Sequence, residues 1–254
     1  MRVHLRAEWT KLRTVPGTAW LLFAVAGLTV ALSALATAAV TCPPDGCAVD
    51  NTKLSLTGVE LGQAAVALLA VLAISGEYST GMIRTTLTAM PGRVTVLTAK
   101  AAVLAGLTMA AGTVAVLGSL LAARLILPGS GQPHPPPSLA DGATLRAAAG
   151  SVLYLMLVAL LSVGVATAVR DSAAAIGTVL GLLYLFPVIA HVISDPQWQR
   201  RLWQISPMDA GLAVQATTDL RSLPLGPWAG LGVLATWTAA ALLCGGLLLR
   251  LRDA

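Results

Sequence analysis

Six long stretches of the sequence contain almost no charged residue, and more polar segments separate them. Their approximate ranges are 18–40, 58–75, 99–127, 145–168, 173–193 and 228–249. A helix rises ~1.5 Å per residue, so about 20 residues cross a hydrocarbon core that is ~30 Å thick. The second stretch is short for a span, and it begins with Glu60 and Gln63. This pattern predicts six membrane-spanning segments.

The continuity of these stretches indicates that the spans are helices. Backbone N–H and C=O groups cannot stay unpaired in lipid, so a spanning segment is either a helix or a strand of a closed barrel. Barrel strands alternate in hydrophobicity over about ten residues, whereas these stretches are apolar throughout. We therefore expect an all-α integral membrane protein in which residues 1–254 form one transmembrane domain.

Composition excludes the other broad classes. Hydrophobic residues make up 56% of the 254 residues, charged residues only 11%, and the mean hydropathy is +0.80. A soluble domain has ~45–50% apolar and ~25% charged residues, and a disordered chain is far less apolar. A membrane protein is the class that remains.

The distribution of Lys and Arg predicts the orientation, because cytoplasmic loops carry an excess of both. With six spans, the two termini lie on the same side of the membrane. Ten of the 16 basic residues fall on that side: Arg2, Arg6, Lys11, Arg13, Arg84, Arg93, Lys100, Arg170, Arg250 and Arg252. We expect a multi-pass protein of the cell membrane with both termini in the cytoplasm. The net charge of +5 then follows from topology and gives no reason to expect a nucleic-acid partner.

Two cysteines, Cys42 and Cys47, lie in the first external loop on either side of a Pro-Asp-Gly turn. The external face permits disulfides, and the turn can bring the two thiols together. A disulfide and a pair of free thiols are both open at this point. Cys244 lies in the last span, where we expect it to serve in packing.

The segment before the first span has a helical apolar pattern. Leu5, Trp9 and Leu12 recur at i, i+4 and i+7, while the arginines of this segment point elsewhere. This pattern favours an amphipathic helix over residues 1–16 that lies in the cytoplasmic interface. The alternative is a basic flank that only sets the topology.

A second helical pattern lies between spans two and three, over residues 76–93. Ser79 or Thr80 can cap the start of a short helix, and Pro91 disfavours helix at the residue before it. The helix so bounded aligns three apolar residues at i, i+4 and i+7, which are Ile83, Leu87 and Met90. This stripe fits a partner protein or a lipid interface equally well.

The sequence lacks the usual marks of a catalytic or ion-coupled site. No lysine follows a glycine, so there is no phosphate-binding loop for ATP. We expect span interiors free of Asp, Glu, Lys and Arg, which an ion-coupled transporter normally needs. His191, near the external end of span five, is expected to be an interfacial residue. We expect no catalytic residue, metal site or cofactor.

Two motifs resemble the ABC-2 type permeases, and more narrowly the stand-alone membrane subunits common in actinobacteria. They are Glu8-Trp9-Thr10-Lys11-Leu12-Arg13 before the first span and Gly76-Glu77-Tyr78-Ser79-Thr80-Gly81-Met82-Ile83-Arg84-Thr85-Thr86-Leu87 after the second. The six-span layout is similar across the whole chain. The resemblance implies that residues 1–16 form an elbow helix, with Leu5, Glu8, Trp9 and Leu12. It implies that residues 80–90 form a coupling helix that docks on an ATPase subunit. The coupling residues would be Glu77, Tyr78, Ser79, Thr80, Met82, Ile83, Arg84, Leu87 and Met90.

The same resemblance implies a function and a set of partners. The chain would be the permease subunit of an ATP-driven exporter, paired with a second permease subunit and with two cytoplasmic ATPase subunits. The external segment with Trp198, Trp203, Pro207 and Trp228 resembles the family's re-entrant gate, with a short helix over 206–220. The same tryptophans are equally typical of an aromatic belt at the outer interface.

Span five carries a possible contact face for the second permease subunit. Ala173, Gly177 and Gly181 recur at four-residue spacing and make one helix face smooth. Spans rich in Ala and Gly also produce this pattern by chance. Two other functions stay open from the sequence. One is a membrane-embedded enzyme or assembly factor that uses His191, and the other is a membrane anchor that recruits a cytoplasmic protein.

Overall fold

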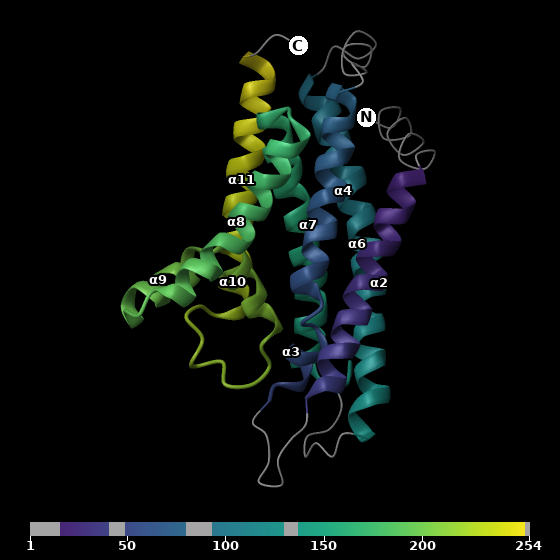
Figure 1. The fold of residues 1–254 in the computed structure, drawn as a ribbon, viewed down its shortest axis with the longest axis vertical. Helices are drawn as coiled ribbons and strands as arrows, with labels where there is room; N and C mark the ends of the chain where they lie inside the picture. The colour runs from purple at the N-terminus through teal and green to yellow at the C-terminus, as the bar shows by residue number, and fades with distance from the viewer. Residues whose placement is uncertain (1–15, 41–48, 80–92, 130–136, 252–254) are drawn as a thin grey trace.

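The computed structural model describes residues 16–40, 49–79, 93–129 and 137–251, and these form helices and connecting loops (Figure 1). The long helices are α2 (Pro16–Ala39), α4 (Val59–Ser79), α6 (Arg93–Ile126), α7 (Gly142–Val169), α8 (Ser172–Val192) and α11 (Pro227–Leu251). The short elements are α3 (Asn51–Ser55), η1 (Leu127–Gly129), α9 (Pro196–Ile205), α10 (Pro207–Leu212) and η2 (Ala213–Gln215). No strand occurs within the described ranges.

Six of these helices are long and apolar enough to cross a membrane, and they coincide with the six predicted stretches. The prediction of an all-α, multi-pass membrane protein is therefore confirmed. Three predicted features lie outside the described residues: the elbow helix over 1–16, the coupling helix over 80–90, and the pair Cys42 and Cys47. The exceptions are residue 16, which begins α2, and the coupling residues 77–79, which end α4.

Two helices extend further than the hydropathy of their residues indicates. The helix α4 continues to Ser79 and α6 begins at Arg93, whereas the predicted spans end at 75 and begin at 99. Hydropathy marks where a segment leaves the lipid, but a helix continues until a residue breaks it. Ser79 is thus the last residue of α4, and the helix that it was expected to cap lies outside the described residues. At ~1.5 Å per residue, α6 is about 51 Å long and exceeds a ~30 Å core.

The extended start of α6 gives Lys100 a buried position within the helix, and only 5% of the residue is exposed. Its Nζ donates to the carbonyl oxygen of Ala73 at 3.4 Å. The expectation that span interiors carry no charged residue stays a prediction, because α6 is longer than a hydrocarbon core.

The helix α7 is the centre of the bundle and packs against α4, α6, α8 and α11 (Figure 1). Its closest neighbour is α11, and glycines make this approach possible. A Cβ on Gly164 would lie 2.5 Å from the backbone carbon of Ala241, and one on Gly245 would lie 2.6 Å from the Gly164 oxygen. Small residues allow backbones to approach in this way.

The predicted smooth face of α8 points away from the bundle. Ala173 and Gly177 are exposed, and a Cβ on Gly177 or Gly181 would meet nothing within 4 Å. The opposite face of α8 buries Ala175 and Val179 instead. The face is thus free of contacts with the rest of the described chain, and its role in dimerisation stays a prediction. Cys244 is also exposed, so its expected role in packing is wrong.

The ends of the spans define two ends of the molecule. The helix α2 begins and α11 ends at one end, which we call the termini end (Figure 1). The elements α3, α9 and α10 lie toward the opposite end. There α8 ends and α11 begins before the level that α2 and α6 reach, and α9 extends sideways, away from the other helices (Figure 1).

The segment between α8 and α11 turns back against the bundle. Asp195 caps α9 by accepting from the backbone N of Gln197 at 2.8 Å, and Ser206 caps α10 by accepting from Asp209 N at 3.1 Å. A proline follows each cap, as is common at the first helical position. The helix expected over 206–220 is present from 207 to 215 and is wrong beyond that point.

Candidate functional site: a charged cavity beside α10

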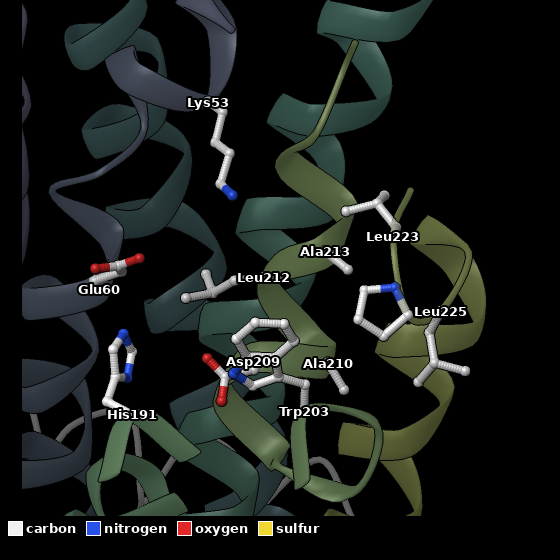
Figure 2. A pocket seen from close by; sticks show the side chains of 11 residues that line it. Lys53, Glu60, His191, Trp203, Asp209, Ala210, Leu212, Ala213, Leu223 and Leu225 are labelled. Atoms are coloured by element: carbon white, nitrogen blue, oxygen red, sulfur yellow. The ribbon is translucent and has the colours of Figure 1, made fainter. Parts of the chain in front are cut away.

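A cavity of about 290 Å³ lies where α3, α4, α8, α9 and α10 meet the loop before α11 (Figure 2). Its lining residues are Lys53, Glu60, His191, Trp203, Asp209, Ala210, Leu212, Ala213, Leu223, Pro224 and Leu225. With Ala213 of η2, six separate elements and one loop therefore contribute to it, and residues from 53 to 225 meet at one place.

Four titratable side chains gather on one side of this cavity. Glu60 comes from the first turn of α4, His191 from the last turn of α8, Asp209 from α10 and Lys53 from α3. Figure 2 shows the two carboxylates and the imidazole projecting into the same region, with the lysine approaching from α3. Each carboxylate is within electrostatic reach of the other and of Lys53. Within the described part of the chain, no two of these four side chains form an ion pair.

The carboxyl group of Asp209 lies in partly buried surroundings. Burial raises the pKa of its carboxyl group, and the Ser206 hydroxyl, His191 and Lys53 lower it only in part. Its Oδ2 is buried, and no hydrogen-bond donor of the described residues reaches it. A buried acceptor without a partner costs about 1–3 kcal/mol, so Asp209 has an unused capacity to accept a hydrogen bond.

The other side of the cavity is apolar. Leu223, Pro224 and Leu225 line it from the loop before α11, and Figure 2 shows Leu223 and Leu225 on this side. This loop is fixed to α9, because Gln204 Nε2 donates to the carbonyl oxygen of Pro224 at 3.0 Å. The cavity therefore has a charged side and an apolar side.

A buried polar network holds α10 against the bundle beneath the cavity. Gln63 of α4 is fully buried, its Nε2 donates to the sulfur of Met208 at 3.1 Å, and its Oε1 accepts from the Tyr154 hydroxyl. The Tyr184 hydroxyl donates to the backbone oxygen of Glu60. These bonds link α4 to α7, α8 and α10, so the position of α10 depends on that of α4.

Asp50 joins the start of α3 to the segment that follows η2. Its carboxylate accepts from Lys53 N at 3.0 Å, from Thr217 Oγ1 at 2.7 Å and from Thr218 N at 3.1 Å. Burial opposes ionisation of this carboxyl group, but the hydrogen bonds outweigh burial and lower its pKa. The backbone N–H groups of Thr217 and Thr218 therefore point to Asp50 and not into a helix. This is why the helix expected over 206–220 ends at 215.

The ionisable groups that line the cavity are two carboxylates, one imidazole and one lysine. The described lining residues include no Ser, Thr or Cys. His191 uses its Nδ1 to bond the carbonyl oxygen of Pro187 at 2.7 Å. Over the described ranges, no three His, Cys, Asp or Glu side chains come close enough together to hold a metal ion.

The structure brings together residues that the sequence does not link. Glu60 is the polar start of a short span in the sequence, and His191 is an interfacial residue. Both share the cavity with Asp209 and Lys53. The tryptophans of the predicted gate region separate: Trp203 lines the cavity, while Trp198 and Trp228 are 56% and 57% exposed. Of the predicted coupling residues, only Glu77, Tyr78 and Ser79 fall in a described helix, at the end of α4.

Together, fold and site define an all-α, multi-pass membrane protein with a charged cavity at the end opposite the termini. Comparison with known proteins adds no family to this description. No family model matches the chain, and no curated protein matches it either.

Proposed function

We propose that this protein is the membrane-spanning permease subunit of an ATP-driven ABC exporter in the cell membrane. In this proposal both termini and the segment over 80–90 are cytoplasmic, and the cavity opens on the external side. Two copies of a separate ATPase subunit supply the energy, and a second permease subunit completes the translocation path. The chain itself is not an enzyme and has no nucleic-acid partner.

The observation that carries the proposal is the segment between α8 and α11. An external segment that turns back toward the bundle before the sixth span is what the sequence resemblance implies. In the structure, α10 packs against α8 and α11, and Pro207, Met208 and Leu212 are buried. A loop with no role in the path has no need of such burial. This packing supports the proposal independently of the motif over 76–87.

The helix α4 offers a physical link between the two ends of the molecule. Its Ser79 end borders the segment proposed to dock on the ATPase, and its other end carries Glu60 and Gln63. Gln63 contacts Met208 of α10 directly. A rigid helix carries a displacement along its length, so a movement at the Ser79 end of α4 reaches Gln63 and, through it, α10. We propose that ATP-driven movement of α4 repositions α10.

The test is co-purification of the ATPase subunit together with ATPase activity, measured for the wild type and for Ile83→Asp. If Ile83 inserts into the ATPase, a carboxylate there buries a charge without a partner, which costs several kcal/mol, and ~1.4 kcal/mol is already tenfold in affinity. We expect loss of the ATPase subunit with normal membrane insertion.

Thr85→Asp is the matched control, because it adds the same charge two positions away, off the stripe of Ile83, Leu87 and Met90. Retention of the ATPase and of its activity in Ile83→Asp would refute the docking role of this segment.

A further inference from the structure

We propose that the cavity beside α10 binds a protonated amine with an apolar body, the ammonium group lying between Glu60 and Asp209. The apolar body lies against Leu223, Pro224 and Leu225. This inference concerns binding to the chain alone, so it stands or falls separately from the proposed exporter function.

The charge balance of the cavity favours a cation. Glu60 and Asp209 belong to α4 and α10, and their carboxylates repel each other across the cavity. Lys53 is within electrostatic reach of both but forms an ion pair with neither in the described chain. Two carboxylates and one ammonium group therefore line the cavity, together with the imidazole of His191. A cation that lies between Glu60 and Asp209 is attracted by both carboxylates, whereas an anion at the same place is repelled by both.

The unused acceptor on Asp209 favours a cation that carries N–H groups. Asp209 Oδ2 is buried and has no donor among the described residues. Hydrogen bonds between an ionised donor and a carboxylate are shorter and stronger than neutral ones. An ammonium N–H satisfies Oδ2, and a quaternary ammonium cannot do so. A metal ion is a poorer occupant, because no three possible ligand side chains in the described residues are close enough together.

The rest of the lining favours a ligand with an apolar body. The loop residues Leu223, Pro224 and Leu225 line the cavity, and Leu223 and Leu225 lie across it from Glu60 (Figure 2). Trp203 adds an aromatic side chain, and aromatic faces attract ammonium groups. A volume of about 290 Å³ is at the lower end of small-molecule sites, which span ~300–1,000 Å³. An amine of about a dozen non-hydrogen atoms is therefore of suitable size.

The test measures binding of 4-phenylbutylamine to the purified protein in lipid nanodiscs by calorimetry at neutral pH, where this amine is protonated. The alcohol 4-phenylbutanol is the uncharged ligand of the same size. We expect saturable binding of the amine and at least tenfold weaker binding of the alcohol. Glu60→Gln and Asp209→Asn should each weaken amine binding at least tenfold and leave alcohol binding nearly unchanged.

Two further variants separate the proposal from a loss of folding or a general charge effect. Lys53→Gln removes the competing positive charge, so it should strengthen amine binding, which a misfolded protein cannot do. Asp219→Asn is the matched control, because Asp219 does not line the cavity and asparagine accepts its left-handed backbone (φ 49°). It should bind the amine like the wild type.

Three results would overturn the proposal. The first is equal binding of the amine and the alcohol by the wild type. The second is an equal loss of amine binding in Asp219→Asn and Asp209→Asn, which would indicate attraction to the surface. The third is weaker binding in Lys53→Gln. Failure of the ATPase test leaves all of these measurements valid, because none of them uses the ATPase.

Discussion

The contact between α10 and α11 provides a sharp test of how the cavity is held together. Gly230 of α11 lies against the carbonyl of Ala210, and a Cβ at Gly230 would lie 1.9 Å from that oxygen. Ordinary van der Waals contact begins at 3.4 Å. The oxygen belongs to the backbone, so no rotation of a side chain can relieve the overlap. In Gly230→Ala, α10 must move by more than 1 Å or leave α11.

The matched variant is Gly232→Ala, two residues further along the same helix, where a Cβ would meet nothing within 4 Å. Replacing Gly by Ala in a helix interior gains ~1 kcal/mol, and this gain is common to both variants. Their difference in stability therefore measures the overlap alone, which we expect to cost about 1–3 kcal/mol. At roughly 2–4 °C per kcal/mol for a chain of this size, Gly230→Ala should melt several degrees below Gly232→Ala.

A second measurement locates the effect at α10. Val214 of η2 is fully buried against α7, where a Cβ on Gly150 would lie 2.2 Å from its Cγ2. In a variant without the native cysteines, Val214→Cys should react slowly with a water-soluble thiol reagent. Adding Gly230→Ala should accelerate the reaction, and adding Gly232→Ala should not. Equal melting temperatures and equal reaction rates would refute the close packing of α10 on α11.

Three further predictions concern other parts of the molecule. Asp50→Asn should destabilise the protein by about 1–3 kcal/mol at neutral pH, because the carboxylate holds charged hydrogen bonds. The pKa of Asp50 is lowered in the folded state, so this stabilisation is present above pH 3.8 and is lost as the pH falls through the lower native pKa. Melting temperatures of wild type and variant should therefore converge in acid, and a constant difference would contradict this. Gly177→Leu should reduce cross-linking between two copies of this chain with normal insertion, and an unchanged pattern would count against the α8 face. In a variant without native cysteines, Cys at Ser138 or Ser222 should react with an impermeant reagent in intact cells, and Cys at Thr88 only after permeabilisation. Labelling of Thr88 from outside would reverse the orientation.

The spans could be predicted from the sequence because the cost of unpaired backbone in lipid permits few structures. Their ends could not, because hydropathy responds to lipid contact and not to helix breakers. Thr95 and Thr98 are polar but compatible with a helix, so α6 begins at Arg93. The short helix α3 begins at the cap Asp50, which accepts from Lys53 N. A helix of one turn has no apolar period, so only the capping residue could have indicated it.

The cavity could not be predicted, because its residues share no local pattern. Lys53, Glu60, His191 and Asp209 lie on four elements, and each has an ordinary explanation within its own segment. In the sequence alone, Glu60 is interpreted as the polar end of a span, and Asp209 is interpreted as a charged residue in a loop. Only the folded bundle, in which Gln63 of α4 bonds to Met208 of α10, brings their carboxylates to one place. One residue does indicate the site from the sequence. Gln63 is polar but lies in an apolar stretch, and in the structure its side chain donates a hydrogen bond to the sulfur of Met208.

The position of Gln63 explains why the two proposals involve the same helix. Gln63, which forms the hydrogen bond to α10, lies one turn from Glu60, whose carboxylate lines the cavity. Both residues therefore move together with α4. A shift of α4 relative to α10 changes the separation of Glu60 and Asp209 and, with it, the fit of a cation between them. By linkage, a cation that binds one arrangement more tightly must favour that arrangement. Binding at the cavity and movement at the Ser79 end of α4 therefore influence each other through one continuous helix, with no second pathway required.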